Sequence, residues 1–351
     1  MKIGIVTFPR AINYGTSLQA AALRAVLLRG GNDVAFCEHQ CERIDSSNAL
    51  FDLKRITDLK YTIAHLCNLP MAVKRKQAFG DFWKKYFQFS ADPLESYDAV
   101  VTGSDQVWNY NLTDHDLFYY LDFDKKDTKK VAYAASFGLS SVPAEQHEQL
   151  RPLLEDFDHL SVRENTAAKI VNDICGHEIA RTVLDPTLLL DREQWREMSD
   201  PAIQGGGYIY VYTVFNSDTL WDFAEELSRK TGLPIRTVSY SCFHKRNAQY
   251  SFIAGPAQWL SYMLGADYVV TNSFHGMAFS VNFQKRFFYE LPPASSGVSS
   301  RLADMAEKYG LQEREIRRAE PDRAIDWEKV NEQLEKDRQD SMAFIQEFIQ
   351  K

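Results

Sequence analysis

One short segment predicts a joint between a buried strand and a helix: Asp267-Tyr268-Val269-Val270-Thr271-Asn272-Ser273-Phe274-His275-Gly276-Met277-Ala278. The strand is expected over residues 267–270 and the helix over residues 275–283, because both are apolar and a polar turn separates them. In an open α/β sheet, ligands bind beyond the carboxyl ends of the strands, where the N–H groups of the next helix favour an anion. The segment therefore predicts an anion-binding site.

Three residues of this segment are candidates for that site. Ser273 is the expected N-cap of the helix, and Gly276 would let the backbone come close to a bound group. A lone histidine at a helix start more often packs or caps than reacts. The place of His275 between Ser273 and Gly276, directly after an apolar strand, makes it a candidate catalytic residue.

Length and composition bound the class of protein. A chain of 351 residues is longer than one hydrophobic core usually serves, so two domains are expected. Hydrophobic residues make up 45%, enough for two cores, and the net charge of −8 predicts no nucleic-acid partner. The sequence enters a strand at once, with no apolar leader and no run long enough to cross a bilayer, which predicts a cytoplasmic protein.

The five cysteines are scattered and odd in number, which is typical of reduced thiols. Cys37 and Cys41 flank His39, but no second pair of ligands follows them. No metal site is predicted.

An N-terminal domain is expected over residues 1–200. It opens as a βαβ unit with a strand at 3–8, a helix at 16–29 and a strand at 33–36. Polar or small residues follow the later apolar strands as well, and the carboxyl ends of parallel strands share one edge of a sheet. The segments that follow these strands are Gly103–Asn109, Ala135–Gly138, Arg163–Asn165 and Asp185–Thr187.

The loop between the first strand and the first helix, Pro9–Gly15, has one glycine where a dinucleotide-binding turn needs three. A dinucleotide is therefore not predicted. Asn13, Tyr14 and Gln19 at this joint could still bind a polar ligand.

Residues 43–89 form a helical insertion rich in lysine, arginine and aromatic residues. One interpretation is a solvated amphipathic insertion whose aromatic side chains join the core. The other is a basic aromatic face that meets an anionic membrane or a lipid-linked phosphate.

A linker is expected over residues 191–207, since Gly205-Gly206-Gly207 precedes a new strand. A second α/β domain follows over residues 208–325, and a C-terminal helix at 326–351 could cross back to the first domain. Two facing Rossmann-like domains with a cleft between them are the simplest architecture.

Seven motifs in sequence resemble the polysaccharide pyruvyltransferase family, in the branch ending in Ser-Phe-His-Gly. They are Asn13–Gly15, Gly103–Asn109, Tyr133–Gly138, Ser161–Glu164, Leu184–Thr187, Thr271–Gly276 and Ser299–Arg301. The resemblance covers most of the chain. It implies a fold like that of GT-B glycosyltransferases and the transfer of an enolpyruvyl-derived group from phosphoenolpyruvate to a sugar, giving a cyclic pyruvate ketal and phosphate.

The resemblance also implies that Arg163 and His275 lie at the donor. This sequence departs from the better-studied branch, because Ser273 and Phe274 stand where an arginine and a leucine precede the histidine. A lysine that other members carry after the following strand has no counterpart either. The donor phosphate must then find other partners.

Phosphoenolpyruvate carries a phosphate and a carboxylate, so its site needs two separated anion binders, and guanidinium groups suit both. Arg163 and Arg301 are the candidates, with Ser300 beside the second and the helix start at Ser273 and Gly276 as a third binder. A surface ion pair is the alternative for each arginine.

Ketal formation needs a proton at the methylene carbon, which points to His275 as the acid, and a base for the sugar hydroxyl, for which Asp105 is the first choice. An aspartate after Gly-Ser can instead satisfy its own turn. No cofactor and no metal are expected, with phosphoenolpyruvate as co-substrate.

Asn13, Tyr14, Gln19 and Trp108 are assigned to the acceptor, which we expect to be an undecaprenyl-linked oligosaccharide at the inner face of the membrane. A nucleotide-sugar glycosyltransferase of GT-B type and a non-catalytic glycan-binding protein are the alternatives, because fold alone does not fix chemistry.

Overall fold

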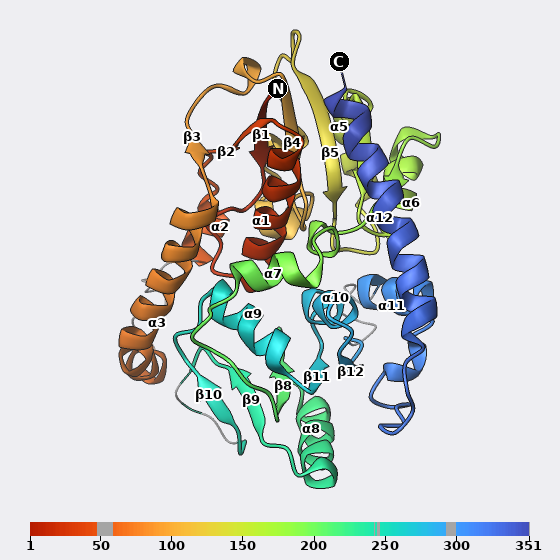
Figure 1. Cartoon of the computed structure of the whole chain (residues 1–351). Helices are drawn as coiled ribbons and strands as arrows, with labels where there is room; N and C mark the ends of the chain where they lie inside the picture. The colour runs from red at the N-terminus through yellow and green to blue at the C-terminus, as the bar shows by residue number, and fades with distance from the viewer. Residues whose placement is uncertain (48–58, 242, 244–245, 293–299, 351) are drawn as a thin grey trace.

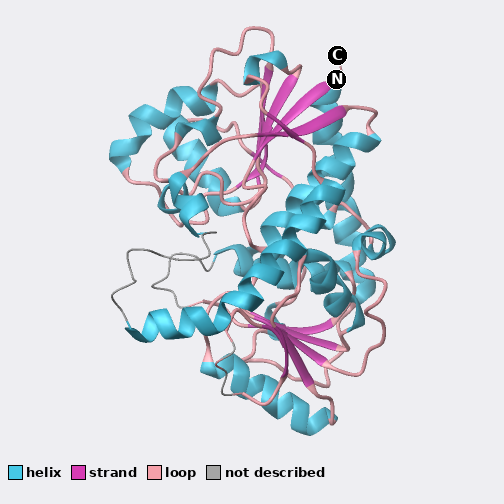
Figure 2. Ribbon diagram, turned by 90° about the vertical axis from the view of Figure 1, so that its left-hand side faces the viewer, coloured by secondary structure: helices cyan, strands magenta, loops and turns pink. Residues whose placement is uncertain are grey.

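The computed structural model describes residues 1–47, 59–241, 243, 246–292 and 300–350. Two α/β domains are stacked one above the other, and each is built around a parallel β-sheet (Figure 1, Figure 2). The predicted α/β class with two Rossmann-like domains is confirmed.

The N-terminal domain holds a seven-stranded sheet in the order β3-β2-β1-β4-β5-β6-β7. Val100 and Val101 of β4, which point to opposite faces, are both fully buried, as expected for a sheet covered on both sides. The strands are β1 (Lys2–Val6), β2 (Asp33–Cys37), β3 (Phe89–Ser90), β4 (Ala99–Thr102), β5 (Lys129–Ala135), β6 (His159–Val162) and β7 (Arg181–Thr182). The helices are α1 (Tyr14–Arg29), α2 (Glu42–Ser47), α3 (Leu59–Tyr86), α4 (Tyr110–Thr113), α5 (His147–Glu155) and α6 (Asn165–Cys175).

The C-terminal domain holds a five-stranded sheet in the order β10-β9-β8-β11-β12. Val269 and Val270 of β11 are fully buried, so this central strand is also covered on both faces. The strands are β8 (Ile209–Tyr212), β9 (Ile235–Val238), β10 (Gln249–Ser251), β11 (Tyr268–Thr271) and β12 (Arg286–Tyr289). The helices are α8 (Asp218–Thr231), α9 (Pro256–Gly265), α10 (Phe274–Asn282) and α11 (Ser300–Lys308).

The strand order reverses once in each sheet. The chain runs outward from β1 to β3 and then returns to the other side of β1 at β4, and it does the same from β8 to β10 before β11. Adjacent helices then lie on opposite faces of the sheet, which leaves a crevice at the carboxyl ends of the two central strands. Each domain therefore has one place built to receive a ligand.

A continuous hydrophobic core joins the two domains. Tyr14 of α1 stacks on Trp259 of α9 with ring centroids 5.9 Å apart, and its hydroxyl donates to Ala254 O at 2.9 Å. Trp259 also packs edge-on against Tyr212 and Phe279. Because these large side chains are buried together, the two domains form one packed unit.

The segment expected as a plain linker contains a helix, α7 (Arg192–Met198), which lies between the domains (Figure 1). Asp191 caps it, because its carboxylate accepts from Gln194 N at 2.8 Å while the Gln194 side chain accepts from Asp191 N at 2.9 Å. Asp191 and Gln194 form a capping box that can be recognised in the sequence. The linker was predicted instead because of the three glycines at 205–207.

The last helix, α12 (Trp327–Ile349), leaves the C-terminal domain and runs along the N-terminal one (Figure 1). Its Phe344 is buried in the core that joins the domains. Arg338 donates to Leu188 O at 2.7 Å and to Asn282 Oδ1 at 3.0 Å, so one side chain contacts both domains.

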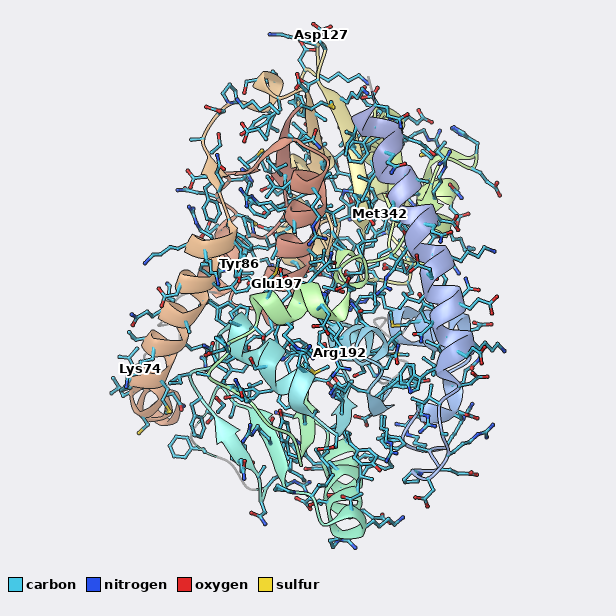
Figure 3. The ribbon with its side chains drawn as sticks, viewed as in Figure 1. Lys74, Tyr86, Asp127, Arg192, Glu197 and Met342 are labelled. Atoms are coloured by element: carbon cyan, nitrogen blue, oxygen red, sulfur yellow. The ribbon has the colours of Figure 1, made fainter. Side chains whose placement is uncertain are left out.

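The described aromatic side chains of α3 do not form an exposed basic aromatic face. Phe79 and Phe82 are buried, and Arg75 is buried against the C-terminal domain, where it donates to Phe252 O at 3.2 Å. Figure 3 shows Tyr86 close to Glu197, where α3 meets α7, and Lys74 at the outer edge of the molecule. Among the described basic side chains of this helix, Lys74, Lys76, Lys84 and Lys85 are exposed. None of the described helices is both long and apolar enough to cross a bilayer.

Candidate functional site

A cleft of about 830 Å³ lies between the two domains. Its walls are the loops that follow β1 and β4 in the first sheet and β8 and β11 in the second, together with the start of α11. Both strand reversals therefore open into the same cleft, which is the place where α/β sheets bind ligands. Five residues assigned from the sequence line it: Asn13, Asp105, Ser273, His275 and Arg301.

His275 lies in the first turn of α10 and reaches across to the N-terminal domain. Its Nε2 is 3.6 Å from Oδ2 of the fully buried Asp185, just beyond hydrogen-bond distance. Burial alone would raise the pKa of Asp185, but His275, Arg163 and Thr187 hold that pKa well below its ordinary value. Asp185 therefore presents a fixed negative charge to the imidazole at neutral pH.

Gly15 of α1 packs directly against that imidazole. A Cβ at position 15 would lie 2.0 Å from Nδ1 of His275 and 2.4 Å from its Cγ. Gly15 is part of a regular helix, so the position requires glycine for space and not for an unusual backbone conformation. The glycine and the histidine come from different domains, and their contact fixes one domain against the other at the cleft.

Asp105 follows β4 and presents an anchored carboxylate to the cleft. Its Oδ2 accepts from Thr16 Oγ1 at 2.6 Å, and its Oδ1 accepts from Gln106 N at 2.9 Å. The Arg163 guanidinium lies 3.8 Å from Oδ1. An ionised carboxylate has about four acceptor positions. Asp105 can therefore satisfy its own loop and still accept a further proton or hydrogen bond.

Arg163 is not exposed to the cleft, contrary to its assignment as a direct donor ligand. Its side chain is 1% exposed and faces Asp185 at 3.0 Å, Glu164 at 3.4 Å and Asp105 at 3.8 Å. Burial would lower its pKa, but these three carboxylates outweigh burial and raise it. The Phe274 ring covers the guanidinium at 4.7 Å. In this structure Arg163 therefore contacts buried carboxylates and does not line the cleft, and its role at the donor stays a prediction.

Arg301 of α11 does line the cleft. Its Nε is buried without a hydrogen-bond partner, and the guanidinium forms no ion pair with any residue that the structure describes. Burial and the nearby Arg163 lower the pKa of Arg301 to about 10, which leaves it cationic at neutral pH. Ser300, assigned to the same donor site, begins α11, but its side chain lies outside the described residues.

The residues around His275 hold the loop in shape. Ser273 caps α10 as predicted, accepting from Gly276 N at 3.3 Å. Thr271 Oγ1 donates to Tyr212 O at 2.6 Å. A Cβ on Gly276 would lie 2.3 Å from Thr271 Oγ1. Asn272 bonds to the backbone of the loop after β8. Gly276 therefore allows a close approach to Thr271, and its approach to a bound group stays a prediction.

Comparison with known sequences identifies the family of this chain. A sequence model of the family described as polysaccharide pyruvyl transferase matches residues 13–289.

The chain belongs to this family.

The match runs from the N-cap of α1 to the end of β12 and so includes Asn13, Asp105, Ser273 and His275 of the cleft, but not Arg301 of α11. Membership makes the protein a transferase. A comparison with curated protein sequences finds no match.

Solved structures of several sugar enzymes are similar to this transferase in fold alone. The UDP-GlcNAc 2-epimerase from Neisseria meningitidis has 10% identity and a TM-score of 0.44, with 99% of this chain and 100% of that chain covered. The UDP-N-acetylglucosamine 2-epimerase from Rickettsia bellii has 8% identity and a TM-score of 0.47, with 99% and 96% covered. A heptosyltransferase from E. coli has 12% identity and a TM-score of 0.38, with 86% and 90% covered.

Three residues assigned to the acceptor lie away from the cleft of the transferase. Tyr14 is buried in the joint between the domains. Gln19 is buried beside Thr7, to which its Nε2 donates at 3.2 Å. Trp108 is fully buried in the core of the N-terminal domain and donates to a backbone carbonyl. Only Asn13 of this group lines the cleft, and it also caps α1 by accepting from Thr16 N. For an aromatic residue with a polar group, such as Tyr14 or Trp108, the sequence does not indicate whether that group faces a ligand or the protein interior.

Three residues of the site were not assigned from the sequence. From the sequence, Asp185 is a polar residue after a strand and part of the motif Leu184–Thr187, Thr16 is the start of a helix, and Gly15 is the single glycine of the loop Pro9–Gly15 and part of the motif Asn13–Gly15. Asp185 carried the clearest signal, because a carboxylate after a predicted strand was expected at the same sheet edge as Asp105 and Arg163.

Among the described residues, no group of three or more His, Cys, Asp or Glu side chains could hold a metal ion. Cys37 and Cys41 line a smaller pocket together with His39. Burial raises the pKa of the Cys37 thiol to about 12, which keeps it protonated at neutral pH.

Replacing Gly15 with alanine should displace the imidazole of His275. The added methyl group has no room, so either the side chain or the domain contact must shift, and a shift of about 1 Å at a reacting group can lower turnover about 100-fold. Steady-state kinetics measure the loss. Gly80→Ala is the matched control, because Gly80 is also helical and its Cβ would meet no atom within 4 Å. Parental turnover of Gly15→Ala would contradict a role for this contact in holding His275.

Proposed function

We propose that this transferase moves the enolpyruvyl-derived group of phosphoenolpyruvate onto a sugar, forming a cyclic pyruvate ketal and releasing phosphate. One observation carries the proposal: a single cleft holds a histidine backed by a buried carboxylate and an arginine that has no ion-pair partner among the described residues. The first suits proton transfer to carbon, and the second suits an anionic donor.

The donor needs two separate anion binders. Arg301 supplies a cation, and the first turn of α10 supplies backbone N–H groups and the positive end of the helix dipole. Phe274 stands where other family members carry a leucine, and it packs over Arg163. In our proposal Arg301 binds the donor in place of the arginine that this branch lacks before His275.

The reaction joins two sugar oxygens to one carbon. The first hydroxyl oxygen bonds to C2 of phosphoenolpyruvate while C3 takes a proton, and the second hydroxyl oxygen bonds to C2 as the bond from C2 to the phosphate oxygen breaks. One hydroxyl proton is balanced by the proton on C3, and the other ends on the released phosphate. His275 as the acid at C3 and Asp105 as the acceptor of the first hydroxyl proton line the same cleft.

Replacing Arg301 with alanine should weaken donor binding. Loss of one charge-assisted hydrogen-bonded pair typically costs about 2–3 kcal/mol, so the KM for phosphoenolpyruvate should rise about 30- to 150-fold. The fold should persist, since Arg301 forms no ion pair with a described residue. Arg286→Ala, an exposed arginine that does not line the cleft, is the control. An unchanged KM for phosphoenolpyruvate would remove Arg301 from the donor site.

The acceptor in this proposal is a lipid-linked oligosaccharide, handled at the inner face of the membrane. The exposed lysines of α3 offer positive charge for a peripheral contact with anionic lipid.

The function is tested by incubating the protein with phosphoenolpyruvate and extracted lipid-linked oligosaccharides. Mass spectrometry should show a gain of one pyruvic acid less one water, together with release of inorganic phosphate. A parallel incubation with nucleotide sugars distinguishes a glycosyltransferase, which would release nucleotide. Absence of both products would favour a glycan-binding protein without catalysis.

A further inference from the structure

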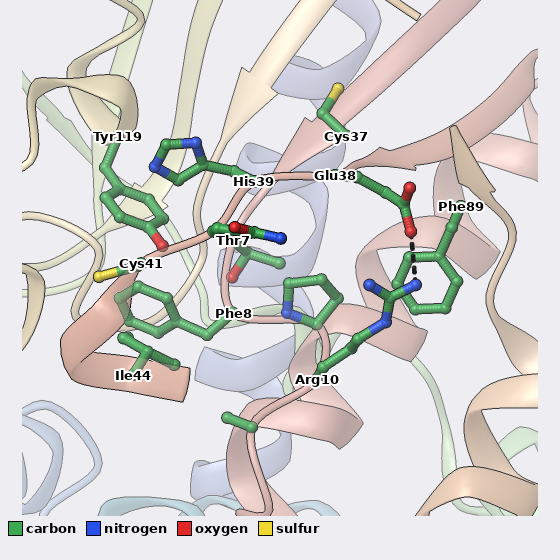
Figure 4. A pocket seen from close by; sticks show the side chains of 13 residues that line it. Thr7, Phe8, Arg10, Cys37, Glu38, His39, Cys41, Ile44, Phe89 and Tyr119 are labelled. Carbon is green, nitrogen blue, oxygen red and sulfur yellow. Dashed lines mark hydrogen bonds and ion pairs between the residues drawn. The ribbon is translucent and has the colours of Figure 1, made fainter. Parts of the chain in front are cut away.

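A second pocket of about 280 Å³ opens beside the main cleft. It lies at the carboxyl edge of the first sheet (Figure 4). Its walls are the loop after β1, the loop after β2, strand β3 and the 3₁₀ turn Leu117–Tyr120. The pocket and the cleft share three lining residues, Phe8, Ala11 and Ile44. A molecule bound in the cleft can therefore extend into this side pocket without leaving the surface of the protein.

The charged groups of the side pocket are paired. Arg10 Nη2 lies 2.5 Å from Glu38 Oε1, and Figure 4 shows this ion pair at the pocket wall. His39 Nε2 lies 2.5 Å from Asp116 Oδ2. The positive charge of Arg10 is thus neutralised in place by Glu38, whereas Arg301 in the cleft has no ion-pair partner among the described residues. Such a pocket favours an uncharged polar occupant over a phosphate or a carboxylate.

Flat apolar surfaces alternate with polar edges around the same pocket. Phe8, Phe89 and Tyr119 supply aromatic rings to its walls. The Arg10 guanidinium lies over the Phe89 ring at 4.1 Å, so its polar edge stands beside that ring. A sugar ring has the complementary form, with C–H groups on its faces and hydroxyl groups around its edge, each both donor and acceptor.

We propose that the side pocket binds an uncharged sugar residue of the acceptor, adjacent to the sugar that receives the pyruvyl group. The inference rests on the proposed function and extends it, because it makes at least a disaccharide the unit that the transferase recognises. Glu38 and Gln40 are exposed at the pocket and can accept and donate hydrogen bonds to sugar hydroxyls.

Each of the two sites carries its own histidine, which gives a direct test by NMR. His39 lines the side pocket and His275 lines the cleft. The ring signals are assigned with His39→Gln and His275→Asn, and the protein is titrated with the methyl glycosides of glucose, galactose, mannose and N-acetylglucosamine. At least one glycoside should shift the His39 signals in a saturable way and leave His275 unchanged, whereas phosphoenolpyruvate should shift His275 alone.

Two variants localise the response. Gln40→Trp fills the pocket with a bulky side chain and should abolish the glycoside response while keeping that to phosphoenolpyruvate. Arg10→Ala removes a polar edge and should weaken glycoside binding about tenfold, the usual effect of one hydrogen bond to a charged group. Arg196→Ala is the matched control, since Arg196 also pairs with a glutamate and its side chain is 54% exposed, against 56% for Arg10.

The outcomes separate this inference from the proposed function. If none of the four glycosides shifts His39, or if inorganic phosphate shifts it, the side pocket is not a sugar site, whatever phosphoenolpyruvate does at His275. If a glycoside shifts His39 and phosphoenolpyruvate fails to shift His275, the sugar pocket stands and the donor assignment falls.

Discussion

Replacing His275 with asparagine is expected to lower turnover about 10²- to 10⁴-fold, the usual contribution of a positioned acid, while the fold and much of the ground-state binding persist. Asparagine fits the space beside Gly15, but its amide cannot deliver a proton to carbon. The loss should appear in kcat at saturating phosphoenolpyruvate and a saturating acceptor.

The pH profile gives a second readout for His275. If the imidazolium supplies the proton, the parental rate falls as rising pH removes that proton, and the asparagine variant lacks this alkaline limb. His177→Asn, at an exposed histidine after α6, is the control. A variant that keeps the parental rate, or keeps the same alkaline limb, would make His275 a structural residue and place the acid elsewhere.

Replacing Asp185 with asparagine is expected to damage both stability and turnover. The change leaves Arg163 without its nearest buried anion and takes the negative charge away from His275. Breaking a buried ion pair by removing one partner typically costs about 3–5 kcal/mol. Urea denaturation should report this loss, and kcat should fall along with it. Asp173→Asn is the control, because Asp173 forms an exposed ion pair on α6 that contributes little.

The loss of stability at acid pH provides a second test of the negative charge on Asp185. The pKa of Asp185 is lowered in the folded state, so the stability it contributes is present above its unfolded pKa of about 3.9 and is lost as the pH falls below that value. The asparagine variant should lack this share of the loss in acid. Equal acid dependence in the parent and the variant would contradict the lowered pKa.

The sequence alone predicted the structure best where neighbours along the chain decide it. The β11–α10 joint was expected at 267–270 and 275–283 and is observed at Tyr268–Thr271 and Phe274–Asn282, because an apolar run and the Ser273 cap act locally. The short strand β10 was not predicted, since three residues carry too little pattern.

The site was predicted only in part, because its contacts depend on which parts of the chain meet. The pairing of His275 with Asp185 and its packing on Gly15 join different domains, and no local pattern encodes them. The surroundings of Arg163 could not be predicted from the sequence either. An arginine at a strand end looks the same in sequence whether it faces a ligand or three buried carboxylates.

The course of α12 has a consequence for how the chain is made. The Ser341 hydroxyl of this helix accepts from Leu184 N, and its Phe344 packs near Tyr133 of β5, so a helix that follows the whole C-terminal domain in the chain completes the first domain. Domains usually fold in order as they leave the ribosome. Until translation reaches α12, the part of the N-terminal domain that this helix covers is expected to stay exposed. A version of the protein cut after the first domain would keep that surface exposed permanently.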